Sequence, residues 1–296
     1  MVPSRSWHSL LPRPRPERGR FLGIDRGGWL LFAAQGLSGL GNGPFIAFSA
    51  IYQRQLGASP LEIGLIAAFG MVVGTLAMVP GTRLAEQADL RRTIVMGWLL
   101  AVPAPLFFLV APHWSLTVVG VAFLSGSFVN APAINVYLTL GVQKERVALV
   151  MTTVLSAFSL GLIVSNLLTG WLAQTVGLRW LFLLPFGFFC LAGLCIGFLP
   201  SKQQPLDGVA APSYPDLFRD RAFVALLFLF ALLTLIIFLP WPFTPLYAQE
   251  VARSDHLQVG SLMGVLYLGS VFMGMTLGGL RRALGCMWIV VCFEAA

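Results

Sequence analysis

Charged residues are scarce in this 296-residue sequence: only 10% of the residues are Asp, Glu, Lys or Arg, whereas 57% are hydrophobic. A soluble domain usually carries about 25% charged residues. So few charges cannot cover the surface of a globular protein in water, and most of the surface must therefore face lipid. The composition excludes an ordinary soluble domain and favours a membrane protein.

Residue patterns that bind metals or catalyse reactions are also lacking. The four cysteines lie in apolar runs without a CxxC pair, which favours a packing role for Cys190, Cys195, Cys286 and Cys292. The sequence shows no paired carboxylates, Ser-His-Asp constellation, metal-spaced histidines or phosphate-binding loop, so we expect neither an enzyme nor a metal or cofactor. The three histidines fall in predicted loops, where we expect solvated side chains for His8, His113 and His256.

Long apolar runs are what the sequence does contain. A helix needs about 20 apolar residues to cross a bilayer core about 30 Å thick. Eight segments reach that length, at residues 28–51, 61–80, 93–112, 115–137, 148–172, 180–199, 222–239 and 257–280. A ninth apolar run opens at Cys286 and stops at Phe293, which is too short to span. The sequence therefore predicts an all-α fold, a polytopic transmembrane helical bundle.

The distribution of positive charge orients this bundle. With alternating spans, one side holds sixteen of the 19 Lys and Arg residues, and the other side holds Arg54, Arg179 and Arg253. Lys and Arg concentrate on the cytoplasmic side of membrane proteins. We therefore predict a plasma-membrane protein with a cytoplasmic N-terminus. The same pattern explains the net charge of +7 without a nucleic-acid partner, and it places the basic N-terminal arm near anionic membrane lipids.

An internal repeat indicates how the spans are grouped. One constant shift along the chain aligns Pro44 with Pro240 and Gln53 with Gln249, and it superposes the first two spans on the seventh and eighth. An even number of spans in the first unit gives a second unit of the same orientation, as in a six-plus-six transporter. A second unit of equal length would extend well beyond Ala296, so we expect a chain truncated after its eighth span; a natural eight-span protein is the alternative.

This grouping predicts four regions along the chain. They are a basic cytoplasmic arm (1–27), a six-helix transmembrane bundle (28–199), a cytoplasmic linker (200–221) and an incomplete second bundle (222–296) that holds helices seven and eight and the start of nine.

Five short segments resemble turns of the major facilitator superfamily (MFS) of transporters. They are LGASPLEIGL (56–65), PGTRLAEQADLRRT (80–93), QKERVAL (143–149), VGLRWLF (176–182) and GGLRRALG (278–285). Together the segments extend over most of the chain, and their order and spacing carry the resemblance. The turn at 80–93 resembles the family signature G-x-L-A-D-R-x-G-R-R, with Glu86 at the Asp position and Asp89 at the second Gly position.

The resemblance implies a conformational latch at this turn. A carboxylate near a helix N-terminus, held by basic side chains, would stabilise one packing of the two bundles. The candidate latch residues are Gly81, Glu86, Asp89, Arg91 and Arg92. The alternative is that these charges only set the membrane topology.

The resemblance also implies a secondary transporter with a solute cavity between its bundles, lined by the first, fourth and seventh helices among others. Polar residues within the spans are the candidates for this lining: Gln35, Asn42, Asn130, Asn135, Asn166 and Tyr267. The alternative role is hydrogen bonding between helices, worth about 0.6 kcal/mol each. No charged residue or histidine occupies the middle of a span, so we expect a neutral or amphipathic small-molecule solute and no buried proton relay.

A coupling ion bound by helices beyond this chain is left open. Two other functions also remain: a non-transporting membrane protein, such as a sensor or assembly partner, and an inactive remnant of a transporter.

Overall fold

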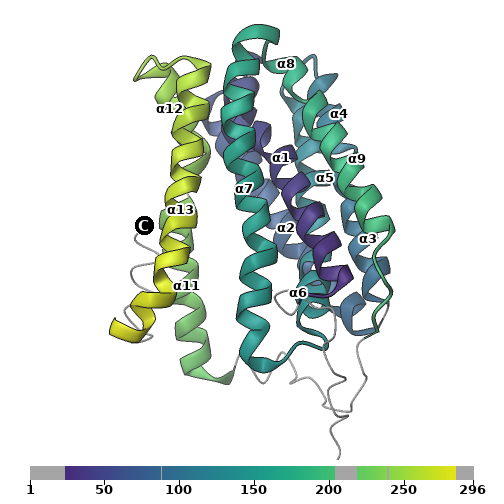
Figure 1. The fold of residues 1–296 in the computed structure, drawn as a ribbon. Coiled ribbons are helices and arrows are strands. Elements are labelled where there is room, and N and C mark those ends of the chain that lie inside the picture. Colours follow the sequence, from purple (N-terminus) through teal and green to yellow (C-terminus); the bar gives the residue numbers. More distant parts are fainter. Residues whose placement is uncertain (1–23, 88, 204–218, 239, 285–296) are drawn as a thin grey trace, which may run out of the picture.

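The computed structural model describes residues 24–87, 89–203, 219–238 and 240–284. All regular structure in these ranges is helical, and most helices run along one common direction (Figure 1). The predicted all-α helical bundle is confirmed. The N-terminal arm with His8, most of the predicted linker, and the ninth apolar run with Cys286 and Cys292 lie outside the described residues.

Of the first six predicted spans, three are continuous helices and three are divided into shorter helices. Three long helices are continuous: α1 (Arg26–Gln55), α2 (Pro60–Gln87) and α7 (Lys144–Val176). The third span consists of α3 (Leu90–Ala101) and α4 (Ala104–Leu109), and the sixth of α8 (Leu178–Leu181) and α9 (Leu183–Gly197). The fourth is divided into α5 (Ser115–Gly126), the 3₁₀ turn η3 (Ser127–Asn130) and α6 (Ala131–Thr139).

Prolines mark several of these breaks. Pro103 is the N-cap of α4, and Pro132 lies in the first turn of α6. A proline lacks a backbone N–H and crowds the preceding helical turn, so it ends or bends a helix. The same rule holds in the second half of the molecule, the helices from α11 (Arg221–Phe238) onward: Pro240 precedes the 3₁₀ turn η4 (Trp241–Phe243), which separates α11 from α12 (Thr244–Glu250). The last described helix is α13 (His256–Leu284).

Five of the described helical segments are long and apolar enough to cross a membrane. They are Pro60–Glu86, Leu90–Leu109, Ser115–Thr139, Arg146–Val176 and Leu178–Gly197. The second to sixth predicted spans are therefore helical and long enough to cross a membrane. The first, seventh and eighth predicted spans are helical as α1, α11 and α13.

Helix α1 is less apolar than those five because it contains several glycines together with Gln35, Ser38 and Asn42, and it lies in the interior. Half of its 30 residues are buried, and it packs mainly against α7 and α9. Helix α2, in contrast, exposes large apolar side chains such as Leu61 and Leu76. Exposed apolar surface of this kind fits a lipid-facing helix, whereas the polar α1 is shielded by its neighbours.

The largest contact between the first half (α1 to α9) and the second half (α11 to α13) joins α7 and α13, and smaller contacts join α1 and α2 to the second half. Helix α13 packs along α7, and α12 contacts α1. Figure 1 shows α11 and α13 on the outer side of α7, with α1 and α9 on its other side. The two halves are therefore joined mainly through α7.

The two ends of the bundle differ in their polar contacts. At one end, here called the Asp25 end, the Lys202 ammonium lies 2.7 Å from Asp25 Oδ2 and 4.1 Å from the centre of the Tyr137 ring. Tyr137 donates a hydrogen bond to the Pro200 carbonyl. These contacts fasten the chain that leaves α9 to the start of α1. The opposite end, here called the Arg54 end, carries the loops after α1, α4, α7 and α12.

Candidate solute cavity and charged turn

A cavity of about 610 Å³ lies within the first half of the molecule. It is lined by residues of α1, α3, α5, η3, α6, α7 and α9. The polar side chains in the lining are Gln35, Ser38, Asn42, Ser125, Ser127, Asn130, Asn135 and Ser159. The aromatic ones are Trp98, Phe128, Phe158 and Phe189. The residues that line this cavity in the described part of the chain include none that is charged.

Four of the six predicted cavity residues share this cavity. Gln35 and Asn42 reach it from α1, and Asn130 and Asn135 reach it from the η3–α6 region. The Asn42 amide nitrogen donates to the Ser38 carbonyl one turn earlier, at 2.8 Å. This internal bond occupies one of its two donor hydrogens.

Asn130 owes its position to a glycine on the neighbouring helix. A Cβ atom at Gly97 of α3 would collide with the Asn130 side chain. Gly97 therefore lets the amide pack between α3 and the cavity, where the Asn130 side chain remains half-buried.

The other two predicted cavity residues lie elsewhere. Asn166 is completely buried on α7, where its backbone carbonyl meets Gly260 of α13. Tyr267 of α13 packs its ring edge against Trp241, with 5.9 Å between ring centres. Neither residue lines the 610 Å³ cavity.

The aromatic lining is what sequence reasoning missed. Trp98, Phe128, Phe158 and Phe189 lie in apolar runs where aromatic residues are common, since they form 12% of the sequence. Aromatic residues in a span can also pack against other helices or face lipid, and the sequence holds no signal that separates these four.

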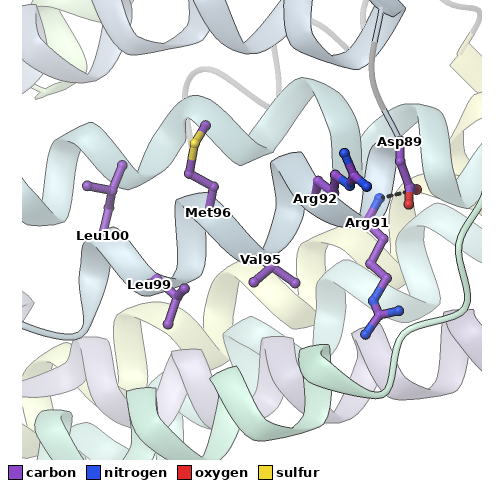
Figure 2. Close-up of a pocket in the computed structure, with 7 residues that line it drawn as sticks. All are labelled: Asp89, Arg91, Arg92, Val95, Met96, Leu99 and Leu100. Carbon is purple, nitrogen blue, oxygen red and sulfur yellow. Dashed lines mark hydrogen bonds between the residues drawn. The ribbon is translucent and has the colours of Figure 1, made fainter.

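A second, shallower pocket of about 630 Å³ lies along α3, from its N-cap Asp89 to Leu100, and includes the charged residues that follow the α2–α3 turn (Figure 2). Asp89 is the N-cap of α3, where its Oδ1 accepts a hydrogen bond from the Arg91 backbone N–H at 3.1 Å. The Arg91 side chain donates to the Gly197 carbonyl at 2.6 Å and so ties α3 to the end of α9. Arg92 is exposed beside the apolar Val95 and Met96.

The predicted latch residues are thus near one another but are not all paired. Within the described residues, no hydrogen bond or ion pair joins Glu86 to Arg91 or Arg92. Gly81 has a clear packing role, because a Cβ atom there would collide with the Val129 backbone of η3. In this conformation Arg91 and Asp89 stabilise the first half internally.

The expectation of a solvated His256 is wrong. His256 is the first residue of α13; its side chain is half-buried, and Nδ1 is buried without a hydrogen-bond partner. Burial lowers the pKa of His256, against the opposing effect of the Asp255 carboxylate. The sequence interpretation failed because α7 and α1, far away in sequence, cover this position. His113, in contrast, is exposed as expected.

Comparison with known proteins agrees with this architecture. No curated protein matches the sequence. The crystal structure of a point variant of the nucleoside transporter NupG matches with a TM-score of 0.71 and 10% sequence identity. The match covers 88% of this chain and 69% of that chain. At this identity the likeness shows the fold alone.

The family model described as Major Facilitator Superfamily matches residues 31–296. This match covers nearly the whole chain, including all the helices that line the cavity and both halves of the molecule. The chain therefore belongs to the Major Facilitator Superfamily, a family of multi-pass membrane transporters.

Proposed function

We propose that the protein carries a small neutral or amphipathic solute across the plasma membrane by alternating access, with its N-terminus in the cytoplasm. The observation that carries this proposal is the uncharged cavity of about 610 Å³. Sites for small molecules typically enclose about 300–1,000 Å³. A single small solute of metabolite size fits this volume.

The chemistry of the lining favours this class of solute. The amides of Gln35, Asn130 and Asn135 can donate and accept hydrogen bonds, and the aromatic rings offer flat apolar surface. An ionic solute would lose its hydration without gaining an opposite charge from the residues around it, which is strongly unfavourable. The cavity therefore suits a solute that has hydrogen-bonding groups and an apolar face but no net charge.

The contact between the halves supports alternating access. Arg54 of α1 and Glu250 of α12 form an ion pair at 2.9 Å, and the repeat shift that aligns Gln53 with Gln249 also aligns these two residues. Equivalent residues of a parallel repeat can touch only near the axis that relates the two units. The pair therefore marks the predicted axis at the Arg54 end. Because both side chains are nearly half exposed, the pair is worth at most about 1 kcal/mol and can break easily.

The charged turn supplies the matching contact at the Asp25 end. In the conformation described here, Glu86 and Arg92 are exposed. We infer that these side chains pair across the turn, or with the second half, when the Asp25 end closes. Closing one end while opening the other is the movement that alternating access requires.

Reconstitution of the chain into liposomes tests the proposal. We expect saturable uptake of at least one solute from a panel of uncharged sugars, nucleosides and amphipathic amines. Nucleosides belong in the panel because the structural neighbour NupG transports them. Liposomes that contain the Trp98→Ala variant, which removes an aromatic wall of the cavity, should show reduced uptake. Parent liposomes that take up no solute faster than empty liposomes would contradict transport and favour a sensor or assembly role.

A further inference from the structure

The α7–α13 seam is the contact between Asn166 and Gly170 of α7 and His256, Gly260 and Gly264 of α13. The two helices touch backbone to backbone here. A Cβ atom on Gly260 would collide with the Asn166 carbonyl, and one on Gly170 would lie 2.9 Å from the His256 carbonyl. Such close packing through small residues is a main source of helix association in membranes. The seam therefore holds the two halves together towards the Arg54 end.

The same seam contains buried polar side-chain atoms that lack hydrogen-bond partners. Among the described residues, the buried side-chain atoms without a hydrogen-bond partner are Asn166 Nδ2, Asn166 Oδ1 and His256 Nδ1. All three belong to the α7–α13 seam. A buried polar group without a partner costs about 1–3 kcal/mol, and this penalty disappears when water reaches the group. The glycine contacts thus favour a closed seam, and the two side chains favour an open one.

The surroundings of His256 contain few groups that could stabilise a charge. Its ring meets Phe48 of α1 edge to face, with 6.0 Å between ring centres. The last turns of α7, residues 165–176, include no titratable side chain. The charged or titratable groups nearest in the chain or on α1 and α12 are Asp255 next to His256, the Arg54–Glu250 pair, the exposed Tyr247 and Arg253, and Tyr52, whose hydroxyl donates to the Phe108 carbonyl. The other loops at the Arg54 end add Glu62, His113 and Arg179.

Protonation of His256 destabilises the closed seam. It makes both ring nitrogens donors, so the buried Nδ1 would carry a hydrogen without an acceptor and the half-buried ring would carry a charge. When α13 moves away from α7, water can solvate both. Binding of a proton and closure of the seam therefore oppose each other.

We propose that His256 is a proton-binding site whose protonation opens the α7–α13 seam. This inference rests on the alternating movement proposed above and adds a coupling ion to it. A proton arriving from the compartment at the Arg54 end binds His256 and favours the conformation that is open to that compartment. Release of the proton allows the seam to close again.

The balance between the closed and the open seam depends on pH, because His256 binds a proton more weakly in the closed seam. The closed seam holds a His256 whose pKa lies below its ordinary value, and a solvated ring in the open seam titrates near the ordinary value of about 6.5. The closed seam is therefore most stable above that value and becomes less stable as the pH falls through it.

Distances between spin labels test the proposal directly. Labels on Gln174→Cys of α7 and Leu262→Cys of α13, both exposed positions, report separation of the helices in a variant whose four native cysteines are replaced. Lowering the pH of the liposomes from about 7.5 to about 5.5, across the range in which histidine titrates, should shift the distances to larger values. The His256→Gln variant should lose this shift. The matched His113→Gln variant, at an exposed histidine of the same end, should keep it.

Two results would overturn the proposal: parent distances that do not change with pH, or a shift that persists in His256→Gln. The Asn166→Leu variant provides an independent check, because it removes the unpartnered amide and keeps the histidine. It should shorten the distances at both pH values and retain the pH response; a lost response would also count against His256.

Solute uptake measured on the same liposomes separates this inference from the transport proposal. A pH-dependent distance shift without uptake of any solute would contradict transport but leave the proton site standing. Uptake without a distance shift would overturn the proton site alone.

Discussion

At the residue scale, the cavity depends on a few uncharged amides held by their neighbours. Asn130 is the best placed of them, because it lies at the break between η3 and α6 and packs beside Gly97. At this break the chain changes from a 3₁₀ turn to an α-helix, so the side chains do not follow one regular helical face. The Asn130 side chain can therefore reach both α3 and a solute.

The Asn130→Ala variant should bind the transported solute more weakly. Loss of one hydrogen bond between neutral groups costs about 1 kcal/mol, which corresponds to an affinity about fivefold lower. Equilibrium binding of the solute identified by the uptake assay measures this change. The control is Gln143→Ala, because Gln143 is exposed at the start of α7 and makes no side-chain capping bond. Equal affinities of Asn130→Ala and the parent would remove Asn130 from the site.

Sequence alone predicted which polar residues lie in spans, but not which way they face. Gln35 and Asn42 line the cavity, whereas Asn166, of the same chemical type, is buried against α13. In a bundle that is apolar on its outer surface as well as inside, the apolar pattern of a helix does not distinguish its faces. Helices that are distant in sequence decide which way each side chain faces. For the same reason, the burial of His256 against α1 and α7 could not be predicted from the sequence.

At the element scale, α1 and α7 are joined by a contact that only small residues permit. A Cβ atom on Gly161 of α7 would collide with the Gly36 carbonyl and lie 3.0 Å from the Gly39 Cα atom. The nearest atoms belong to the backbone of α1 and cannot move aside as a flexible side chain would. The polar α1 is held in the interior by this contact.

The Gly161→Leu variant should therefore be less stable. Overpacking a close contact costs about 1–3 kcal/mol, so we expect a clearly lower Tm in detergent and a reduced yield of folded protein. The control is Gly187→Leu in α9, where an added Cβ atom would meet nothing within 4 Å. A Tm of Gly161→Leu equal to that of Gly187→Leu would show that α1 and α7 are not in contact at this position.

Apolar length predicted the positions of the helices well, because about 20 apolar residues suffice to define a span. The breaks inside spans followed less directly. Pro103 marks the division between α3 and α4, but Pro44 and Pro80 lie within the continuous helices α1 and α2. A proline permits a break, and packing with neighbouring helices decides whether the break forms.

At the scale of the whole molecule, the repeat and the contacts support the same arrangement. The sequence shift relates the first two helices to the seventh and eighth, and two residues related by that shift, Arg54 and Glu250, form the ion pair between the halves. The sequence could not predict this pair, because a repeat relates positions without showing which of them meet. We propose that the halves separate at the Arg54 end when they come together at the Asp25 end.

The orientation of the molecule in the membrane is the remaining prediction. Arg83 near the end of α2 and Arg146 at the start of α7 both lie at the Asp25 end, and His113 lies at the Arg54 end. Because Lys and Arg loops are retained in the cytoplasm, we expect Arg83→Cys and Arg146→Cys to be protected in intact cells from a maleimide that does not cross membranes. His113→Cys should react. The native cysteines are replaced in all three variants.

Permeabilised cells provide the control, since all three cysteines should then react. Protection of His113→Cys together with reaction of Arg83→Cys and Arg146→Cys would reverse the proposed orientation but leave the fold intact. Reaction of only one of the two arginine positions would be more serious, because α2 ends and α7 begins at the same end of the bundle. An even number of crossings separates the two positions, so no membrane protein with this packing could place them on opposite sides.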